Sequence, residues 1–184
     1  MPSALLVCGS RSLARDPEAT AWAKAEIKAR MRATSPDLVM HGAAYGPDQW
    51  AGRCVDELAD EGIRVSFIHE VHAHGLAVVW TRDPDEFGRY CRRHPWSDSL
   101  LLQGASPLVR NVYMVNAMAY LAALGCRVLV LGLVDATSPT RGTDHTLRHA
   151  RAAGLTPLPR EAQSRHGQSP RPQPARPVSR GRAG

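Results

Sequence analysis

Three glycine-containing segments of the chain combine a flexible backbone with side chains that suit a phosphate-bearing ligand. They are 9–12, 41–48 and 142–143, and each follows an apolar run and leads into a helical pattern. Glycine lets the backbone approach a ligand closely, and a helix N-terminus offers unpaired N–H groups with a partial positive charge. We therefore predict one ligand site. Its residues are Gly9, Ser10, Arg11, Ser12, His41, Gly42, Ala43, Gly46, Asp48, Arg110, Gly142 and Thr143.

Three side chains near these segments have two interpretations each. Arg110 lies one turn into a predicted helix with Met114 on the same face, and a guanidinium there binds phosphate or carboxylate bidentately. Taken alone, it is predicted to be an ordinary solvated arginine. Asp48, in the first turn of another helix, either favours the helix dipole or holds ribose hydroxyls or a water. Trp50 has the ring to stack on a base, but we predict that it packs against the sheet.

The segment 69–74 contains the residue types that bind metal ions. The metalloprotease pattern needs two histidines four residues apart around a glutamate, but residue 73 is alanine. His72 and His74 would share one face of an extended segment, yet no fourth ligand can be named. We therefore predict a polar loop here, with no metal and no other cofactor.

An alternation of short apolar runs and helical patterns must position these residues. Strands are predicted at 4–8, 37–40, 63–68 and 127–133. Helices are predicted at 17–32, 47–61, 107–124 and 144–153, with Asp16 and Ser106 as N-caps. The alternation predicts an α/β fold, a Rossmann-like doubly wound and mostly parallel sheet with helices on both faces. In such sheets ligands bind at the carboxyl ends of the strands.

The predicted organisation is a single domain followed by a tail. With 43% hydrophobic residues, the 184-residue chain can bury one core, which we assign to residues 1–160. Residues 69–104 fit the alternation poorly and are interpreted as an insertion. Residues 161–184 are rich in Pro, Arg, Ser, Gln and Gly, without apolar periodicity. Such a segment cannot bury enough surface to offset its ordering entropy, so we predict a disordered tail.

Charge and cysteine usage limit the partners and the compartment. The net charge is +6, but residues 160–184 hold six arginines against the single acid Glu161, which leaves +1 for the other residues. A nucleic-acid partner is therefore expected only through the tail. No apolar stretch approaches the roughly 20 residues that span a bilayer, and no secretion signal is visible. The cysteines lack zinc-site or redox spacing, so we predict free thiols in a cytoplasmic protein. They are Cys8, Cys54, Cys91 and Cys126.

Four motifs in this order resemble those of the SLOG superfamily, which includes the SMF/DprA proteins and the Lonely Guy phosphoribohydrolases. They are 8–11 (CGSR), 41–48 (HGAAYGPD), 108–114 (LVRNVYM) and 141–146 (RGTDHT). The match is best with the YspA-like branch and covers residues 5–159. It implies a Rossmann-like fold and a site for a nucleotide or a nucleotide derivative, ADP-ribose-like molecules included. It adds Asn111, Arg141 and Thr146 to the predicted site and, by analogy, predicts a homo-oligomer.

The resemblance to the Lonely Guy enzymes does not extend to all of their catalytic residues. These enzymes cleave an N-glycosidic bond with an arginine and with the glutamate of a Gly-Gly-x-Gly-Thr-x-x-Glu turn. Arg110 matches the arginine, but Thr146 stands at the position of the glutamate, and Pro139-Thr140 replace the preceding glycines. Threonine cannot supply a carboxylate. Asp48 or Asp144 would have to substitute.

Three functions follow as hypotheses. The first is a protein that binds a nucleotide or a nucleotide-derived ligand, as a sensor or accessory factor. The second is an N-glycosidase, a hydrolase that acts on a nucleoside 5′-monophosphate with Asp48 and Arg110 as catalytic residues. The third is an accessory protein that binds DNA.

Overall fold

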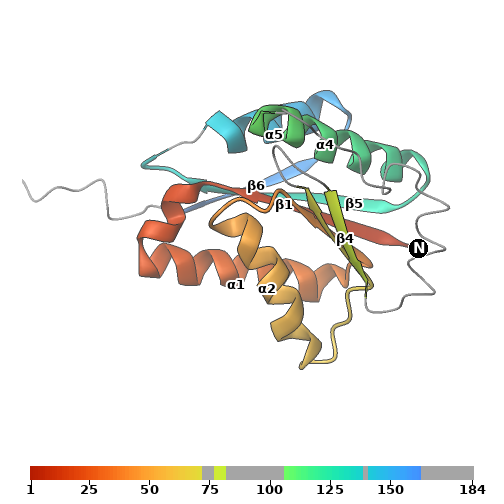
Figure 1. Ribbon diagram of the computed structural model, residues 1–184, viewed down its shortest axis with the longest axis horizontal. Coiled ribbons are helices and arrows are strands. Elements are labelled where there is room, and N and C mark those ends of the chain that lie inside the picture. Colours follow the sequence, from red (N-terminus) through yellow and green to blue (C-terminus); the bar gives the residue numbers. More distant parts are fainter. Residues whose placement is uncertain (72–76, 82–105, 139–140, 163–184) are drawn as a thin grey trace, which may run out of the picture.

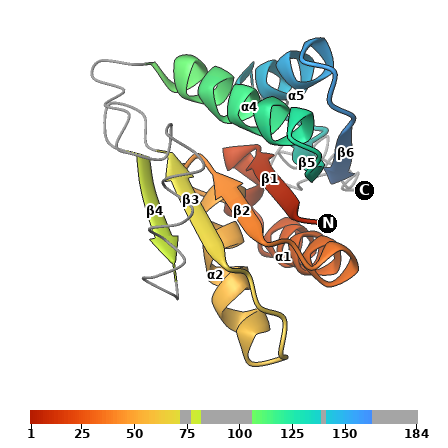
Figure 2. The same ribbon diagram turned by 90° about the vertical axis from the view of Figure 1, so that its right-hand side faces the viewer.

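A computed structural model describes residues 1–71, 77–81, 106–138 and 141–162 of the chain. In this part of the chain six strands form one open sheet in the order β4-β3-β2-β1-β5-β6 (Figures 1 and 2). The strands are β1 (Ser3–Gly9), β2 (Leu38–His41), β3 (Phe67–Val71), β4 (Ala77–Thr81), β5 (Arg127–Asp135) and β6 (Pro157–Ala162). Neighbouring strands are parallel except β4, which pairs with β3 antiparallel. The predicted Rossmann-like, mostly parallel α/β fold is confirmed.

Helices cover both faces of this sheet. The 3₁₀ helix η1 (Arg11–Arg15) leads into α1 (Pro17–Thr34), and α1 and α2 (Pro47–Ala59) lie on one face. The other face carries α4 (Pro107–Ala123) and α5 (Arg141–Ala152). The predicted N-caps are confirmed: Asp16 accepts hydrogen bonds from the first turn of α1, and Ser106 accepts one from Val109 N.

The alternation of side chains along β1 divides the apolar core into two layers. Leu5 and Val7 point to the layer beneath α1 and α2, which includes Trp50. Ala4 and Leu6 point to the layer beneath α4 and α5. This is the period-two pattern of a strand buried on both faces. The prediction that Trp50 packs against the sheet is confirmed.

The third strand begins later than predicted, at Phe67 rather than at 63. The residues after α2 close that helix instead, because Gly62 N and Ile63 N donate to carbonyls of its last turn. The strand then continues to Val71, and the apolar run near residue 80 forms β4. Residues 69–71 and 77–81 thus belong to the sheet rather than to an insertion. The rest of 69–104, with His72 and His74, lies outside the described residues.

Two elements near the end of the described chain also differ from the prediction. Helix α5 starts at Arg141, three residues early, so Gly142 and Thr143 lie in its first turn. Strand β6 was not predicted, because its prolines argue against a strand. It is an edge strand that pairs only with β5, where a missing N–H is tolerated. The sheet therefore extends to Ala162, two residues into the predicted tail.

The described residues also show whether this part of the chain contains a membrane-spanning helix, a candidate metal site or a disulfide. No helix among them is long and apolar enough to cross a membrane. They contain no group of three or more His, Cys, Asp or Glu side chains that could hold a metal ion. Cys8, Cys54 and Cys126 are free thiols, and Cys91 lies outside the described residues.

Candidate functional site

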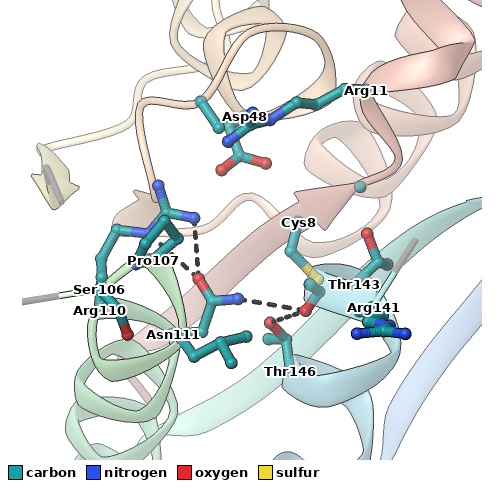
Figure 3. Close-up of a pocket in the computed structure, with 14 residues that line it drawn as sticks. Cys8, Arg11, Asp48, Ser106, Pro107, Arg110, Asn111, Arg141, Thr143 and Thr146 are labelled. Atoms are coloured by element: carbon teal, nitrogen blue, oxygen red, sulfur yellow. Dashed lines mark hydrogen bonds between the residues drawn. The ribbon is translucent and has the colours of Figure 1, made fainter.

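A pocket of about 500 Å³ opens at the carboxyl end of β1 (Figure 3). The strand order reverses at this point, because β2 lies on one side of β1 and β5 on the other. Open α/β sheets bind their ligands at such a switch point. The first turns of α2, α4 and α5 contribute to the wall. The lining residues are Cys8, Gly9, Arg11, Ala44, Asp48, Ser106, Pro107, Leu108, Arg110, Asn111, Arg141, Gly142, Thr143 and Thr146.

The structure brings most of the predicted site residues to this pocket. Those in its wall are Gly9, Arg11, Asp48, Arg110, Asn111, Arg141, Gly142, Thr143 and Thr146. The others are not part of the wall: they are Ser10, Ser12, His41, Gly42, Ala43 and Gly46. They lie at the end of β2 or in the segments after β1 and β2, whose shape positions the residues of the wall.

The two serines after β1 connect that strand to its surroundings. Ser10 is fully buried, and its N–H donates to Leu133 O at 2.9 Å. Its hydroxyl accepts a hydrogen bond from Asp135 N at 3.2 Å, so Ser10 joins the ends of β1 and β5. Ser12 is buried within η1. Both side chains are thus directed into the protein rather than toward the pocket.

The β2–α2 loop is shaped by His41, Ala43 and Gly46. His41 is buried, and its Nδ1 accepts a hydrogen bond from Ala43 N at 3.2 Å. Its Nε2 lies 3.5 Å from Glu70 Oε1 on the neighbouring strand. Ala43 and Gly46 have positive φ angles of 53° and 101°, which turn the chain into α2. The loop therefore has a fixed shape, and it presents Asp48 to the pocket.

Asp48 is a buried carboxylate in the first turn of α2, where only 4% of the residue is exposed. Burial raises its pKa from 3.8 to about 6, although Arg110 and the backbone N–H groups of Ala44, Gly42 and Gly9 act to lower it. The N–H groups of two glycine-containing loops thus face a resident carboxylate. These N–H groups therefore stabilise the charged form of Asp48, and phosphate binding by these loops stays a prediction.

Arg110 is also buried, with 7% of the residue exposed, so the prediction of a solvated arginine is wrong. Its Nε and Nη2 donate to Asn111 Oδ1 at 3.1 and 2.9 Å, and its Nη1 donates to the carbonyl of Gly42. These bonds use three of the five N–H donors of a guanidinium. Burial lowers the pKa of Arg110, while Asp48 raises it and Arg11 lowers it further. The guanidinium is therefore fixed in place beside the pocket, with donors left for a ligand.

Gly42 makes room for both charged groups. A Cβ atom at this position would lie 2.7 Å from Asp48 Oδ2 and 2.7 Å from Arg110 Cζ, closer than packed atoms approach. Its carbonyl holds Arg110, and its N–H faces Asp48. The glycine is needed so that a carboxylate and a guanidinium can approach the same stretch of backbone.

A chain of hydrogen bonds ties Arg110 on α4 to the first turn of α5 (Figure 3). Because a guanidinium can only donate, Asn111 must turn its Oδ1 toward Arg110. Its Nδ2 then donates to Gly142 O at 3.1 Å, and Thr146 Oγ1 donates to the same carbonyl at 3.0 Å. Asn111 and Thr146 line the pocket, but their main polar contacts are within the protein. Asn111 is a positioning residue for Arg110.

Asp48 is the only carboxylate among the described residues that line the pocket. The alternative, Asp144, is not in the wall: its side chain is 61% exposed and forms an ion pair with Arg148 at 2.9 Å. Cys8 lies in the floor near Asp48, and burial raises its pKa far above the neutral range. The thiol therefore stays protonated and is no nucleophile at neutral pH.

The wall also contains residues that the sequence motifs did not identify as ligand-binding. They are Cys8, Ala44, Ser106, Pro107 and Leu108. The start of α4 could have been placed here from a general rule, because a helix that leads into a parallel strand runs back along the sheet and therefore begins at its carboxyl edge. The predicted N-cap at Ser106 was thus a signal for the site as well as for the helix.

Comparison of the chain with protein-family models, with curated proteins and with solved structures finds no match.

Proposed function

We propose that the pocket binds a phosphorylated sugar of the nucleotide type, such as a nucleoside phosphate or an ADP-ribose-like molecule, and that the protein is a sensor or accessory factor for it. The observation that carries this proposal is the placement of Asp48 and Arg110, both buried, beside one pocket. A carboxylate accepts hydrogen bonds from sugar hydroxyls, and a guanidinium donates to oxygen atoms of the sugar or phosphate. A phosphorylated sugar offers both kinds of group.

The phosphate end of the ligand is best placed on the α5 side of the pocket. Arg141, Gly142 and Thr143 form the first turn of α5, where the helix dipole favours an anion. Arg11 contributes a second exposed guanidinium to the wall, near enough to Arg110 to lower the pKa of that group. An anion near these arginines would relieve their mutual repulsion.

The volume of the pocket, its position in the sheet and the sequence resemblance all support a nucleotide-type ligand. A volume of about 500 Å³ lies within the usual range for small-molecule sites, which is roughly 300–1,000 Å³. The pocket lies at the switch point where nucleotides bind in comparable α/β sheets. The four motifs that resemble the SLOG superfamily imply a nucleotide-type ligand too, and each of them contributes at least one residue to the pocket wall.

Isothermal titration calorimetry with ribose 5-phosphate, the common nucleoside 5′-monophosphates and ADP-ribose tests the proposal. We expect at least one of them to bind, and Arg141→Gln to weaken its binding about tenfold through the loss of a charge-assisted contact. Arg148→Gln is the matched control, because Arg148 lies on the same helix and pairs with Asp144 outside the pocket wall. No binding of any of these compounds, or equal losses in the two variants, would contradict the proposal.

A second candidate function, N-glycosidase activity, is favoured by the pKa of Asp48. A carboxylate with a pKa of about 6 is suited to general base catalysis near neutral pH. In this reaction Asp48 would take a proton from the water that attacks the anomeric carbon of the sugar. The C–N bond breaks, the base leaves with its bonding electron pair, and it gains a proton from solvent while Asp48 returns the proton of the water to solvent.

Chromatography of the products from a panel of nucleoside 5′-monophosphates tests this second candidate. We expect release of free base by the unmodified chain, and its loss in Asp48→Asn at nucleotide concentrations that saturate each protein. Asp144→Asn is the control, because that carboxylate is exposed and lies outside the pocket wall. If the unmodified chain releases no base from any of these nucleotides, the protein is not a glycosidase of this class.

A further inference from the structure

The N-termini of α4 and α5 both reach the pocket, but they differ in chemistry. Helix α5 begins with Arg141 and Gly142. Helix α4 begins with Pro107, which has no N–H, and its capping residue Ser106 already accepts a hydrogen bond from Val109 N at 3.4 Å. The start of α4 is thus poorly suited to an anion, although the helix dipole is the same.

The side chains at the start of α4 are apolar and accessible. Pro107 and Leu108 line the pocket together with Ala44 of the β2–α2 loop. Leu108 is 43% exposed, whereas the charged groups of Asp48 and Arg110 belong to residues that are at most 7% exposed. We name Ala44, Pro107 and Leu108 the apolar lip. It gives one part of the wall a surface that a polar sugar or phosphate does not match.

The exposed apolar residues lie at the start of α4 and the exposed Arg141 at the start of α5, while the buried guanidinium of Arg110 lies on the α4 side. In Figure 3 Ser106 and Pro107 lie at one side, Arg141 and Thr143 at the other, and Cys8 between them with Asp48 above. A ligand that spans this arrangement has an anionic end near α5, hydroxyl groups near Asp48, and an apolar group near α4. A nucleoside 5′-monophosphate has its phosphate, ribose and base in this order.

We propose that the apolar lip holds the base of a nucleoside 5′-monophosphate, and that Leu108 is the residue by which the pocket distinguishes such a nucleotide from a bare sugar phosphate. This inference rests on the proposed function, because it assumes that the sugar lies at Asp48 and the phosphate at α5. It assigns an orientation to the ligand: base on the α4 side, phosphate on the α5 side. A flat aromatic base buries its face against Leu108 and Pro107, and that apolar contact adds to the affinity.

The test compares ribose 5-phosphate with AMP, GMP, CMP and UMP by isothermal titration calorimetry of the full chain. We expect at least one nucleotide to bind about tenfold more tightly than ribose 5-phosphate, because only the nucleotide buries apolar surface at the lip. Leu108→Ser should remove most of this difference, because it weakens nucleotide binding much more than ribose 5-phosphate binding. Leu124→Ser is the matched control: Leu124 follows the other end of α4, is 56% exposed, and should leave both affinities unchanged.

Two of the three possible negative outcomes overturn this inference while the proposed function stands. If ribose 5-phosphate binds as tightly as every nucleotide, the base has no site at the lip, while the phosphorylated-sugar proposal stands. If Leu108→Ser weakens ribose 5-phosphate and nucleotide equally, Leu108 shapes the pocket but does not contact a base, and the inference is overturned. If none of the five compounds binds, the inference fails together with the proposal that nucleoside monophosphates are ligands.

Discussion

Two opposing electrostatic effects determine the pKa of Asp48. Burial favours its neutral form, whereas Arg110 and the surrounding backbone N–H groups favour its charged form, and burial has the larger effect. Because Asn111 and Gly42 fix Arg110 in place, the guanidinium cannot follow the carboxylate as a mobile surface arginine would. Asp48 is thus a carboxylate whose charge depends on conditions close to neutral pH.

The pKa of Asp48 should respond to the removal of Arg110. We expect a value of about 6 in the unmodified chain and a higher one in Arg110→Met, because burial remains while the opposing cation is gone. Carbon-13 NMR of the aspartate side-chain carboxyl groups, followed through a pH titration, measures both values. Arg148→Met is the control and should leave Asp48 unchanged. A pKa near 4 in the unmodified chain would show that the carboxylate is well solvated.

The same ionisation should appear in the pH dependence of stability. Between about pH 4 and pH 6 the folded chain retains the Asp48 proton, and the unfolded chain does not. Because the folded state binds more protons in this window, the free energy of unfolding falls as pH rises through it. In Asp48→Asn this contribution is absent, so the variant should gain stability relative to the unmodified chain by on the order of 2 kcal/mol from pH 4 to pH 7. Urea unfolding at both pH values measures the gain, and a constant difference would contradict the expectation.

The roles of individual site residues were only partly predictable from the sequence. Asp48 and Arg110 could be identified because each stands in the first turns of a helix that begins at the ligand edge. Their burial could not be predicted, since it depends on loops distant in sequence: Arg110 bonds to Gly42, and Asn111 to Gly142. These contacts also decide that Asn111 supports Arg110 instead of binding the ligand itself.

At the scale of elements, Gly9 has a packing role at the junction of β1 and α2. A Cβ on Gly9 would lie 2.5 Å from Pro47 Cγ and 3.0 Å from Leu133 O. The proline ring and the backbone carbonyl cannot easily move away. Gly9 therefore allows the start of α2 to pack directly on the end of β1, and this contact places Asp48 over the pocket.

Gly9→Ala should destabilise the fold by about 2 kcal/mol, because it forces an overpacked contact between α2 and β1. The matched control is Gly52→Ala within α2, where the nearest atom to a new Cβ is His41 Nε2 at 3.4 Å. This control should be neutral or stabilising by up to about 1 kcal/mol, since alanine is the better helix former. Chemical denaturation measures both, and equal effects of the two substitutions would refute the packing role of Gly9.

Elements were predictable where local signals were strong, as at Asp16-Pro17 and Ser106-Pro107, where a cap precedes a helix-starting proline. They were not predictable where tertiary pairing decides. Strand β3 begins at Phe67 because the preceding residues close α2, and β6 contains prolines that only an edge position tolerates. Residues 77–81 form a strand only because they pair with β3 in the antiparallel direction.

At the scale of the whole molecule, β6 is the last element of the described chain. It pairs with β5 from Pro157 to Ala162, and Arg160 on it forms a bidentate ion pair with Glu26 on α1 at 2.9 and 3.0 Å. Leu158 packs into the core layer beneath α1. The strand thus covers one edge of the sheet and connects it to the helices.

Two truncations test how much β6 contributes to the stability of the fold. A chain that ends after Ala162 retains β6 and should melt within about 2 °C of the full chain, since it loses no described contact. A chain that ends after Thr156 loses the β5–β6 pairing and the Arg160–Glu26 pair, so its melting temperature should fall by about 10 °C or more. Thermal unfolding followed by circular dichroism compares them. Equal melting temperatures would show that β6 contributes little to the fold.

The chain that ends after Ala162 also tests whether DNA binding involves the domain or only the basic segment that follows it. Residues 163–184 contain five arginines and no acid, so the truncated chain has a net charge of +1 against +6 for the full chain. Phosphate neutralisation by arginine gives an affinity that falls steeply with salt and is independent of sequence. We therefore expect the full chain to bind duplex DNA weakly and with a strong salt dependence, and the truncated chain not to bind in the same gel-shift assay.

Nucleotide binding should be equal in the two chains, because every residue that lines the pocket is retained. DNA binding that survives the truncation would place a nucleic-acid surface on the domain itself and would favour the DNA-binding hypothesis over a small-molecule sensor.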